Sequence, residues 1–141
     1  MNDPIAMLKR DHREAEAMLK ELAKSAKPSA TRRKTATKLV AALEQHMRIE
    51  EQLVYPLVEK RVGHEPEQEA ETEHRLAREE LANIEKLVVD EPGFGAAVAM
   101  LTAGIKHHVK EEETEVFPKL KSKLERDELA TLGDAISAAQ R

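Results

Sequence analysis

Residues 46–56 read HMRIEEQLVYP, and residues 108–118 read HVKEEETEVFP. The two stretches share His, Glu, Glu, Val and Pro, with close exchanges of Met for Val, Arg for Lys and Tyr for Phe. Self-similarity at a fixed shift, here the shift that carries His46 onto His108, indicates an internal repeat. The chain therefore reads as two copies of one helical hairpin, over about residues 4–62 and 66–126.

A second set of residues repeats in the same register. The shift that carries His46 onto His108 also aligns Asp11-His12-Arg13 with Glu73-His74-Arg75. The first histidine of each copy is therefore equally far in sequence from the histidine of the longer motif, in the pairs His12 to His46 and His74 to His108. A pseudo-two-fold arrangement of the histidines is the expected consequence.

Apolar residues recur at helical spacing in four long segments. We expect helices over about 4–26, 30–62 and 66–89, and a fourth through the segment that carries residues 101–120. Helix starts are indicated by the N-cap pair Asp3-Pro4, by Ser29, and by Asp127, which opens a short last helix through Ala139. Nothing in the sequence alternates like a β-strand.

Four amphipathic helices joined by short links predict an all-α fold, namely an antiparallel up-down four-helix bundle with a short extra C-terminal helix. The length of 141 residues indicates a single domain over 1–141. Pro56 lies inside the second predicted helix, where it removes a backbone donor and bends the chain. We therefore expect the segment after Tyr55-Pro56 to tilt across the end of the bundle.

The composition excludes several classes of function. Charged residues make up 35% of the chain, aromatic residues 2%, and the net charge is -4, which does not favour nucleic acid as a partner. The apolar runs are far shorter than the roughly 20 residues that span a bilayer, and no signal core follows Met1, so we expect no membrane association and a cytoplasmic location. The chain has no cysteine, so any metal must be held by nitrogen and oxygen.

Six residues on the predicted apolar stripes are candidate metal ligands, because an unpaired histidine or carboxylate is costly to bury there. They are His12, His46, Glu50, His74, His108 and Glu112. A histidine and a glutamate four positions apart lie about 40° apart around a helix and present nitrogen and oxygen to one point. Each carboxylate can bridge two metals, and the donor set suits iron, manganese or zinc.

A metal-free interpretation stays open beside this one. A glutamate four positions after a histidine is more often only a weak side-chain pair on an exposed helix. On that interpretation the protein is a helical interaction module, and its histidines are ordinary core residues.

The order of His, then HxxxE, then His, then HxxxE resembles the hemerythrin-like, or HHE cation-binding, superfamily, over about residues 5–120. The resemblance implies two iron ions joined by an oxo or hydroxo bridge, with manganese or zinc as the alternatives. It further implies that His12 and His46 bind one iron, that His74 and His108 bind the other, and that Glu50 and Glu112 bridge them.

The chain departs from the oxygen-carrying hemerythrins at two positions. These proteins place a fifth histidine four positions after the third, where this chain has Arg78. Their last carboxylate stands five positions after the histidine, which here is Glu113, whereas helical geometry favours Glu112. The chain is more similar to the bacterial and iron-sensing branches.

That resemblance implies a non-haem di-iron protein that binds, senses or reduces a small oxidant, with dioxygen, peroxide and nitric oxide as candidates. It leaves open whether the site turns over, with catalase-like or oxidase-type chemistry as one outcome. The alternative is an iron-responsive regulator or iron buffer without redox turnover. We expect a monomer or a weak dimer.

Tyr55 differs from its repeat counterpart, Phe117, by one hydroxyl group. The phenol of Tyr55 is a candidate metal ligand, hydrogen-bond donor or redox partner, whereas Phe117 can only pack. A functional role near the metals is therefore a hypothesis for Tyr55 alone.

Further polar residues lie near the motifs. His64 and His107 are expected to be solvated, because one lies in a link and the other is about 100° off the ligand face. Glu16 is expected to pair with Arg78, its repeat counterpart, rather than to bind metal. Glu115 replaces an apolar residue of the other repeat, and it either accepts a hydrogen bond near the ligands or borders solvent.

Overall fold

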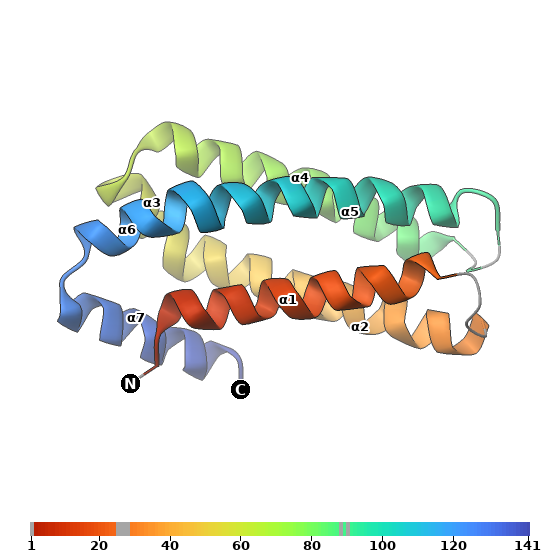
Figure 1. The fold of residues 1–141 in the computed structure, drawn as a ribbon, viewed down its shortest axis with the longest axis horizontal. Helices are drawn as coiled ribbons and strands as arrows, with labels where there is room; N and C mark the ends of the chain where they lie inside the picture. The colour runs from red at the N-terminus through yellow and green to blue at the C-terminus, as the bar shows by residue number, and fades with distance from the viewer. Residues whose placement is uncertain (1, 25–28, 88, 90) are drawn as a thin grey trace.

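The computed structural model describes residues 2–24, 29–87, 89 and 91–141. Within these ranges the chain is helical throughout its regular structure and contains no strand, which confirms the all-α prediction. Four of the helices are long, and Figure 1 shows that they lie side by side along the long axis of the molecule. They are α1 (Pro4–Ala23), α2 (Ser29–Ile49), α4 (His64–Lys86) and α5 (Phe94–Glu111).

Shorter helices gather at one end of these four (Figure 1). They are α3 (Tyr55–Arg61), α6 (Phe117–Lys123) and α7 (Arg126–Ala139). Helix α1 packs against α2, α5 and α7, while α4 packs against α5, α2 and α3. The predicted short C-terminal helix is therefore present and lies against α1. None of the described helices is long and apolar enough to cross a membrane.

The predicted helix boundaries need correction at several ends. Asp3 caps α1 as expected, and its side chain accepts hydrogen bonds from the amides of Ile5 and Ala6. Helix α1 ends at Ala23, before the predicted residue 26, and α4 covers His64–Lys86 instead of 66–89. The predicted break before the second helix, at residues 26–29, falls largely outside the described residues.

Two predicted helix starts are slightly shifted. Ser29, predicted to mark the start of the second helix as its N-cap, is itself the first residue of α2. Helix α7 is capped by Glu125 and not by Asp127, because the side chain of Glu125 accepts from the backbone of Glu128 while the side chain of Glu128 accepts from the backbone of Glu125. This reciprocal capping box satisfies two amide groups at once, which a cap at Asp127 would not do.

The second predicted helix, over 30–62, is helical from Ser29 to Arg61, but a π-helical turn, η1 (Glu50–Val54), divides it into α2 and α3. A second turn, η2 (Glu112–Val116), occupies the same place in the other repeat. In each turn a closing amide donates to the carbonyl that opens the turn, from Tyr55 to Glu50 and from Phe117 to Glu112. A proline follows directly, and the wider turn avoids the collision of its ring with the preceding turn of helix.

After η1 the chain changes direction. Figure 1 shows α3 turning from the line of α2 toward the start of α4, and α3 packs against α4 and α6. This agrees with the tilt expected from Pro56, although the irregularity begins earlier, at Glu50. Each π-helical turn thus starts at one of the two predicted carboxylate ligands.

Apolar residues form two clusters along the long helices. One contains Leu19, Leu39 and Ile84, and the other contains Leu8 and Leu120. On α1 and α4 the second cluster precedes the predicted histidine ligand and the first cluster follows it, whereas on α2 the change from the first to the second cluster falls between His46 and Glu50. After α5 the change falls at Glu112, between Val109 and Val116. The buried polar residues therefore form a layer between two apolar regions.

Candidate metal centre

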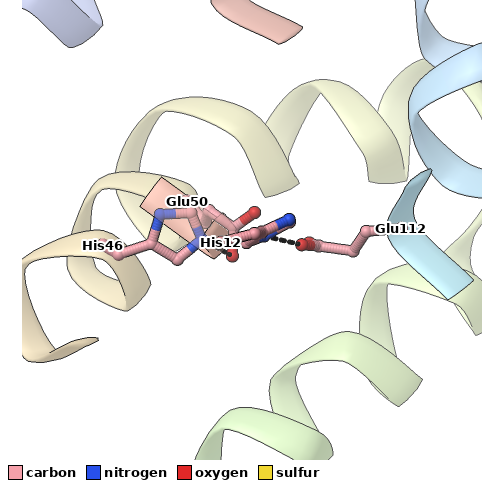
Figure 2. Close-up of side chains that lie close together, drawn as sticks. All are labelled: His12, His46, Glu50 and Glu112. Carbon is pink, nitrogen blue, oxygen red and sulfur yellow. Dashed lines mark ion pairs between the residues drawn. The ribbon is translucent and has the colours of Figure 1, made fainter. Parts of the chain in front are cut away.

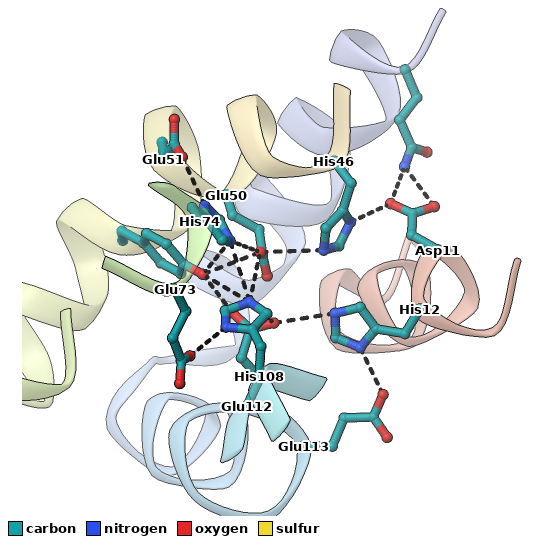
Figure 3. A network of polar contacts seen from close by, with 12 residues as sticks. Asp11, His12, His46, Glu50, Glu51, Glu73, His74, His108, Glu112 and Glu113 are labelled. Atoms are coloured by element: carbon teal, nitrogen blue, oxygen red, sulfur yellow. Dashed lines mark hydrogen bonds and ion pairs between the residues drawn. The ribbon is translucent and has the colours of Figure 1, made fainter. Parts of the chain in front are cut away.

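The six predicted ligands come together in this layer. All are buried, with Glu50 and Glu112 only 0% and 1% exposed. Figure 2 shows the side chains of His12, His46, Glu50 and Glu112 lying close together, and Figure 3 shows His74 and His108 completing the group. Helices α1, α2, α4 and α5 supply one histidine each, and the two carboxylates open the π-helical turns.

Each carboxylate lies between one histidine from each repeat. Glu112 Oε1 is 3.1 Å from His12 Nε2 and 3.2 Å from His108 Nε2. Glu50 Oε1 is 3.2 Å from His46 Nε2 and 3.1 Å from His74 Nε2. The Nε2 atoms of all four rings therefore face the two carboxylates, and each carboxylate touches both halves of the chain.

Several of these atoms are close without being hydrogen-bonded. Among the described residues, His12 Nε2, His46 Nε2, Glu50 Oε2 and Glu112 Oε1 are buried side-chain atoms with no hydrogen-bond partner. Leaving such atoms unpaired costs roughly 1–3 kcal/mol each. A cation among them would satisfy these atoms, so the residues present fit a bound metal.

The ligand atoms fall into two groups, each with its atoms within 4.8 Å of one another. The first group is His12, His46, Glu50 and Glu112, and the second is Glu50, His74 and His108. Glu50 belongs to both groups. Nitrogen and carboxylate oxygen without sulfur are suitable donors for iron, manganese or zinc.

The second nitrogen of every ring is also held by a carboxylate (Figure 3). The Nδ1 contacts are His12 to Glu113 at 2.7 Å, His46 to Asp11 at 2.9 Å, His74 to Glu51 at 2.7 Å and His108 to Glu73 at 2.6 Å. A carboxylate that accepts the Nδ1 proton fixes the ring and leaves Nε2 to bind metal. The four imidazoles are thus oriented before any metal binds.

Residues 3–120 match the Hemerythrin HHE cation binding domain, which is more than half of the chain. The chain belongs to this family. It is also 30% identical, over 122 residues and 84% of its length, to an uncharacterised hemerythrin-like protein of Schizosaccharomyces pombe. The chain spans 60% of the length of that relative. No solved structure gave a significant match.

In this hemerythrin HHE domain the supporting carboxylates follow the internal repeat. Asp11 corresponds to Glu73 in the repeat, and Glu51 corresponds to Glu113. The sequence alone did not predict a supporting role for these four residues. A sequence feature could have identified them, because each lies directly beside a predicted ligand and both pairs recur in the internal repeat. However, neighbouring residues on a helix point about 100° apart, so a carboxylate beside a ligand is ordinarily expected to face solvent.

Arginines hold two of these carboxylates in turn. Arg78 donates to both oxygens of Glu51, at 2.7 and 2.9 Å, and to Glu44 at 3.0 Å. The predicted pair between Glu16 and Arg78 is therefore wrong, because Arg78 faces α2 while Glu16 pairs with Arg13 on its own helix at 2.7 Å. Arg13 also binds Glu113.

Tyr55 lies within the ligand group. Its side chain is buried, and its hydroxyl is 2.7 Å from Glu112 Oε2, 3.1 Å from Glu50 Oε1 and 2.9 Å from His74 Nε2. Burial and the charges of the two carboxylates raise the pKa of Tyr55 well above its usual value. The phenol therefore keeps its proton and acts as a hydrogen-bond donor. Phe117 only packs, and it stacks on the His12 ring at 6.0 Å.

Two of the candidate ligand histidines, His46 and His108, carry positive charge when no metal is bound. Burial alone lowers the pKa of His46, but the charge of Glu50 and the hydrogen bond to Asp11 outweigh it and raise the pKa to about 10. The pKa of His108 is likewise raised, against its burial, by Glu112. The pKa of Glu50 is lowered well below its usual value, because the neighbouring histidines outweigh its burial. A metal must therefore displace protons from these rings.

Three other polar residues stand outside the centre. His64 contacts Glu59 and is exposed, and His107 is 62% exposed beside Glu73, so both are solvated as expected. The side chain of Glu115 is 63% exposed and lies 3.4 Å from Lys119. It borders solvent and does not support the ligands.

Proposed function

We propose that this chain is a single hemerythrin-like domain over 1–141, built from two helical hairpins (about 4–62 and 66–126) in an antiparallel up-down bundle, and that it binds two iron ions. The proposed ligands are His12, His46, Glu50, His74, His108 and Glu112. His12 and His46 would hold one iron, His74 and His108 the other, and Glu50 and Glu112 would bridge them. Manganese or zinc is the less favoured occupant.

One observation carries this proposal. Each buried carboxylate lies between one histidine of the first hairpin and one of the second, at 3.1 to 3.2 Å. A carboxylate that serves a single metal needs no such neighbours on both sides. The equal placement of Glu50 and Glu112 supports two bridging ligands and hence two metals.

We further propose that the centre binds, senses or reduces a small oxidant, namely dioxygen, peroxide or nitric oxide. Bound iron would supply a coordination position and electrons for such a ligand. Tyr55 would donate a hydrogen bond to a bridging carboxylate or to the ligand, because its hydroxyl lies within 3.1 Å of both carboxylates and keeps its proton.

Arg78 helps to distinguish reversible oxygen carriage from the sensing or reduction of a small oxidant. It stands four positions after His74, and its guanidinium binds Glu44 and Glu51, so it adds no imidazole to the centre. A centre with four histidines in place of five supports sensing or reduction over oxygen carriage.

The test is to load the purified protein with ferrous iron without oxygen, measure iron per chain, and then add oxygen, peroxide or nitric oxide while recording absorption spectra. We expect two irons per chain and a spectral change with at least one of the three ligands. Stoichiometric iron with no response to any of them would overturn the proposed use and leave iron binding standing.

An iron-responsive regulator without redox turnover is the second candidate, and a specific contact favours it. Gln140, directly after α7, donates to Asp11 at 3.2 Å, and Asp11 holds His46. Metal binding at His46 would thereby be coupled, through Asp11 and Gln140, to the packing of α7 against α1. On this candidate, iron removal increases hydrogen exchange across α7, whereas peroxide consumption stays at the level of free iron.

A further inference from the structure

An apolar cavity leads from the surface between α4 and α5 to the candidate metal centre. Its volume is about 440 Å³, and its inner wall includes His12, His46, His74 and His108. At its outer end lie Leu76 and Met100, which are 52% and 63% exposed and are the two large apolar side chains found exposed among the described residues. The cavity thus connects solvent with the imidazole rings.

Helical spacing explains the opening. On α5 the lining residues Met100, Ala103, Gly104 and His107 recur at intervals of three and four and form one stripe. Gly104 stands in the middle of this stripe, and a Cβ atom built there would meet no described atom within 4 Å apart from its chain neighbours and the backbone of its own helix. Small residues at the centre of the stripe therefore keep the space between the helices open.

The two copies of the internal repeat differ at the residues that form this opening. The first-repeat counterparts of Leu76, Met100 and Gly104 are Glu14, Lys38 and Ala42. The ligands and their supporting carboxylates are matched between the two halves, but the apolar mouth belongs to the α4–α5 half alone. Metal binding therefore does not explain the mouth, because the proposed ligands occur in both halves and the mouth residues in only one.

We propose that this cavity is the path by which a small uncharged ligand, such as dioxygen or nitric oxide, enters the centre, and that Gly104 keeps the path open. The inference rests on the proposed function. An apolar passage favours molecules that lose little hydration on entry, and it opposes ions, whose desolvation is costly. The acidic side chains Glu79 and Glu80 at its lining add repulsion of anions.

The cavity itself is tested without iron. Xenon binds in apolar cavities, so xenon pressure on the metal-free protein should shift the methionine methyl NMR signals of Met47 and Met100, which line the cavity, and leave Met7, in the other apolar cluster, unchanged. Gly104→Leu should abolish these shifts. Gly95→Leu is the matched control, because Gly95 is also on α5, a Cβ there likewise meets no described atom within 4 Å beyond its chain neighbours and its own helix backbone, and it does not line the cavity.

The path is tested with nitric oxide and the ferrous protein. We expect Gly104→Leu to slow association about tenfold, which corresponds to about 1.4 kcal/mol in the barrier, with iron content and equilibrium affinity unchanged. Gly104→Ala should give a smaller effect, and Gly95→Leu none. Equal rates in all variants, or no xenon shifts in the wild type, would overturn the entry path and leave the proposed function intact. Failure of the wild type to hold iron would overturn the proposed function, and the path with it.

Discussion

Nδ1 of His74 lies 2.7 Å from a carboxylate oxygen of Glu51. The same distance joins His12 to Glu113, the repeat counterpart of Glu51. A repeated contact of this kind orients both rings with Nε2 toward the buried carboxylates, and it makes Nε2 a better donor to a metal. The carboxylate contacts that orient the proposed ligands are therefore repeated along the chain together with the proposed ligands.

The first prediction concerns this support. Replacing Glu51→Gln keeps the shape of the side chain but removes the charge that accepts the Nδ1 proton, so we expect metal affinity to fall by about 10- to 100-fold. Glu113→Gln should weaken binding to a similar extent, because it is the repeat counterpart. Competition with a metal indicator measures both, with Glu115→Gln, at an exposed carboxylate, as the control. Unchanged affinity in both variants would show that the contacts do not orient the ligands.

The second prediction separates the roles of Tyr55. In Tyr55→Phe the ring still fits, as Phe117 does in the other repeat, but Glu112 loses the hydroxyl donor at 2.7 Å. We expect the metal-free protein to lose about 1.5–3 kcal/mol of unfolding free energy, since the bond is to a charged group. Iron content should not change. A loss of iron would instead identify Tyr55 as a ligand.

The third prediction is a pH dependence of the metal-free protein. The pKa of His46 is raised from 6.5 to about 10 in the folded state, so its protonation stabilises the fold fully below pH 6.5 and this contribution is lost as the pH rises toward 10. Urea unfolding in the presence of a chelator should give a falling free energy across that window.

Two comparisons check the assignment to His46. The variant His46→Gln should show a flatter profile over the same pH range, and the metal-loaded protein should also be flatter because its rings are already deprotonated. A metal-free wild type whose stability is constant or rises from pH 6.5 to 10 would contradict the assignment.

The fourth prediction concerns the seating of α7. A Cβ atom at Gly133 would lie 1.8 Å from the backbone oxygen of Asn2, so Gly133→Ala must displace α7 or the segment before α1. We expect a loss of about 1–3 kcal/mol in unfolding free energy, as for other overpacked sites. Gly95→Ala, at an open position of α5, should be neutral or stabilise by up to about 1 kcal/mol. Equal effects of the two substitutions would contradict the close packing.

The helices and the six converging residues could be predicted from the sequence for one physical reason. Polar ligands on an apolar helical stripe are costly to bury alone, and the internal repeat placed them in register. Membership of the hemerythrin HHE family agrees with that pattern.

What the sequence did not reveal depends on packing between helices. The π-helical turns share the apolar pattern of ordinary helices, and only the steric demand of Pro56 and Pro118 separates them. The partner of Arg78 was mispredicted because repeat alignment does not say which neighbouring helix a long side chain faces. The cavity beside Gly104 likewise depends on how α4 and α5 meet.

The most direct test of the di-iron assignment is the amount of iron bound per chain after loading with ferrous iron in the absence of oxygen. We predict about two irons per chain, since two ligand groups share Glu50, and we predict that Glu50→Ala lowers this to one or fewer. Protein that retains no stoichiometric metal, and that loses no stability in His46→Ala, would contradict the assignment and support a metal-free helical module.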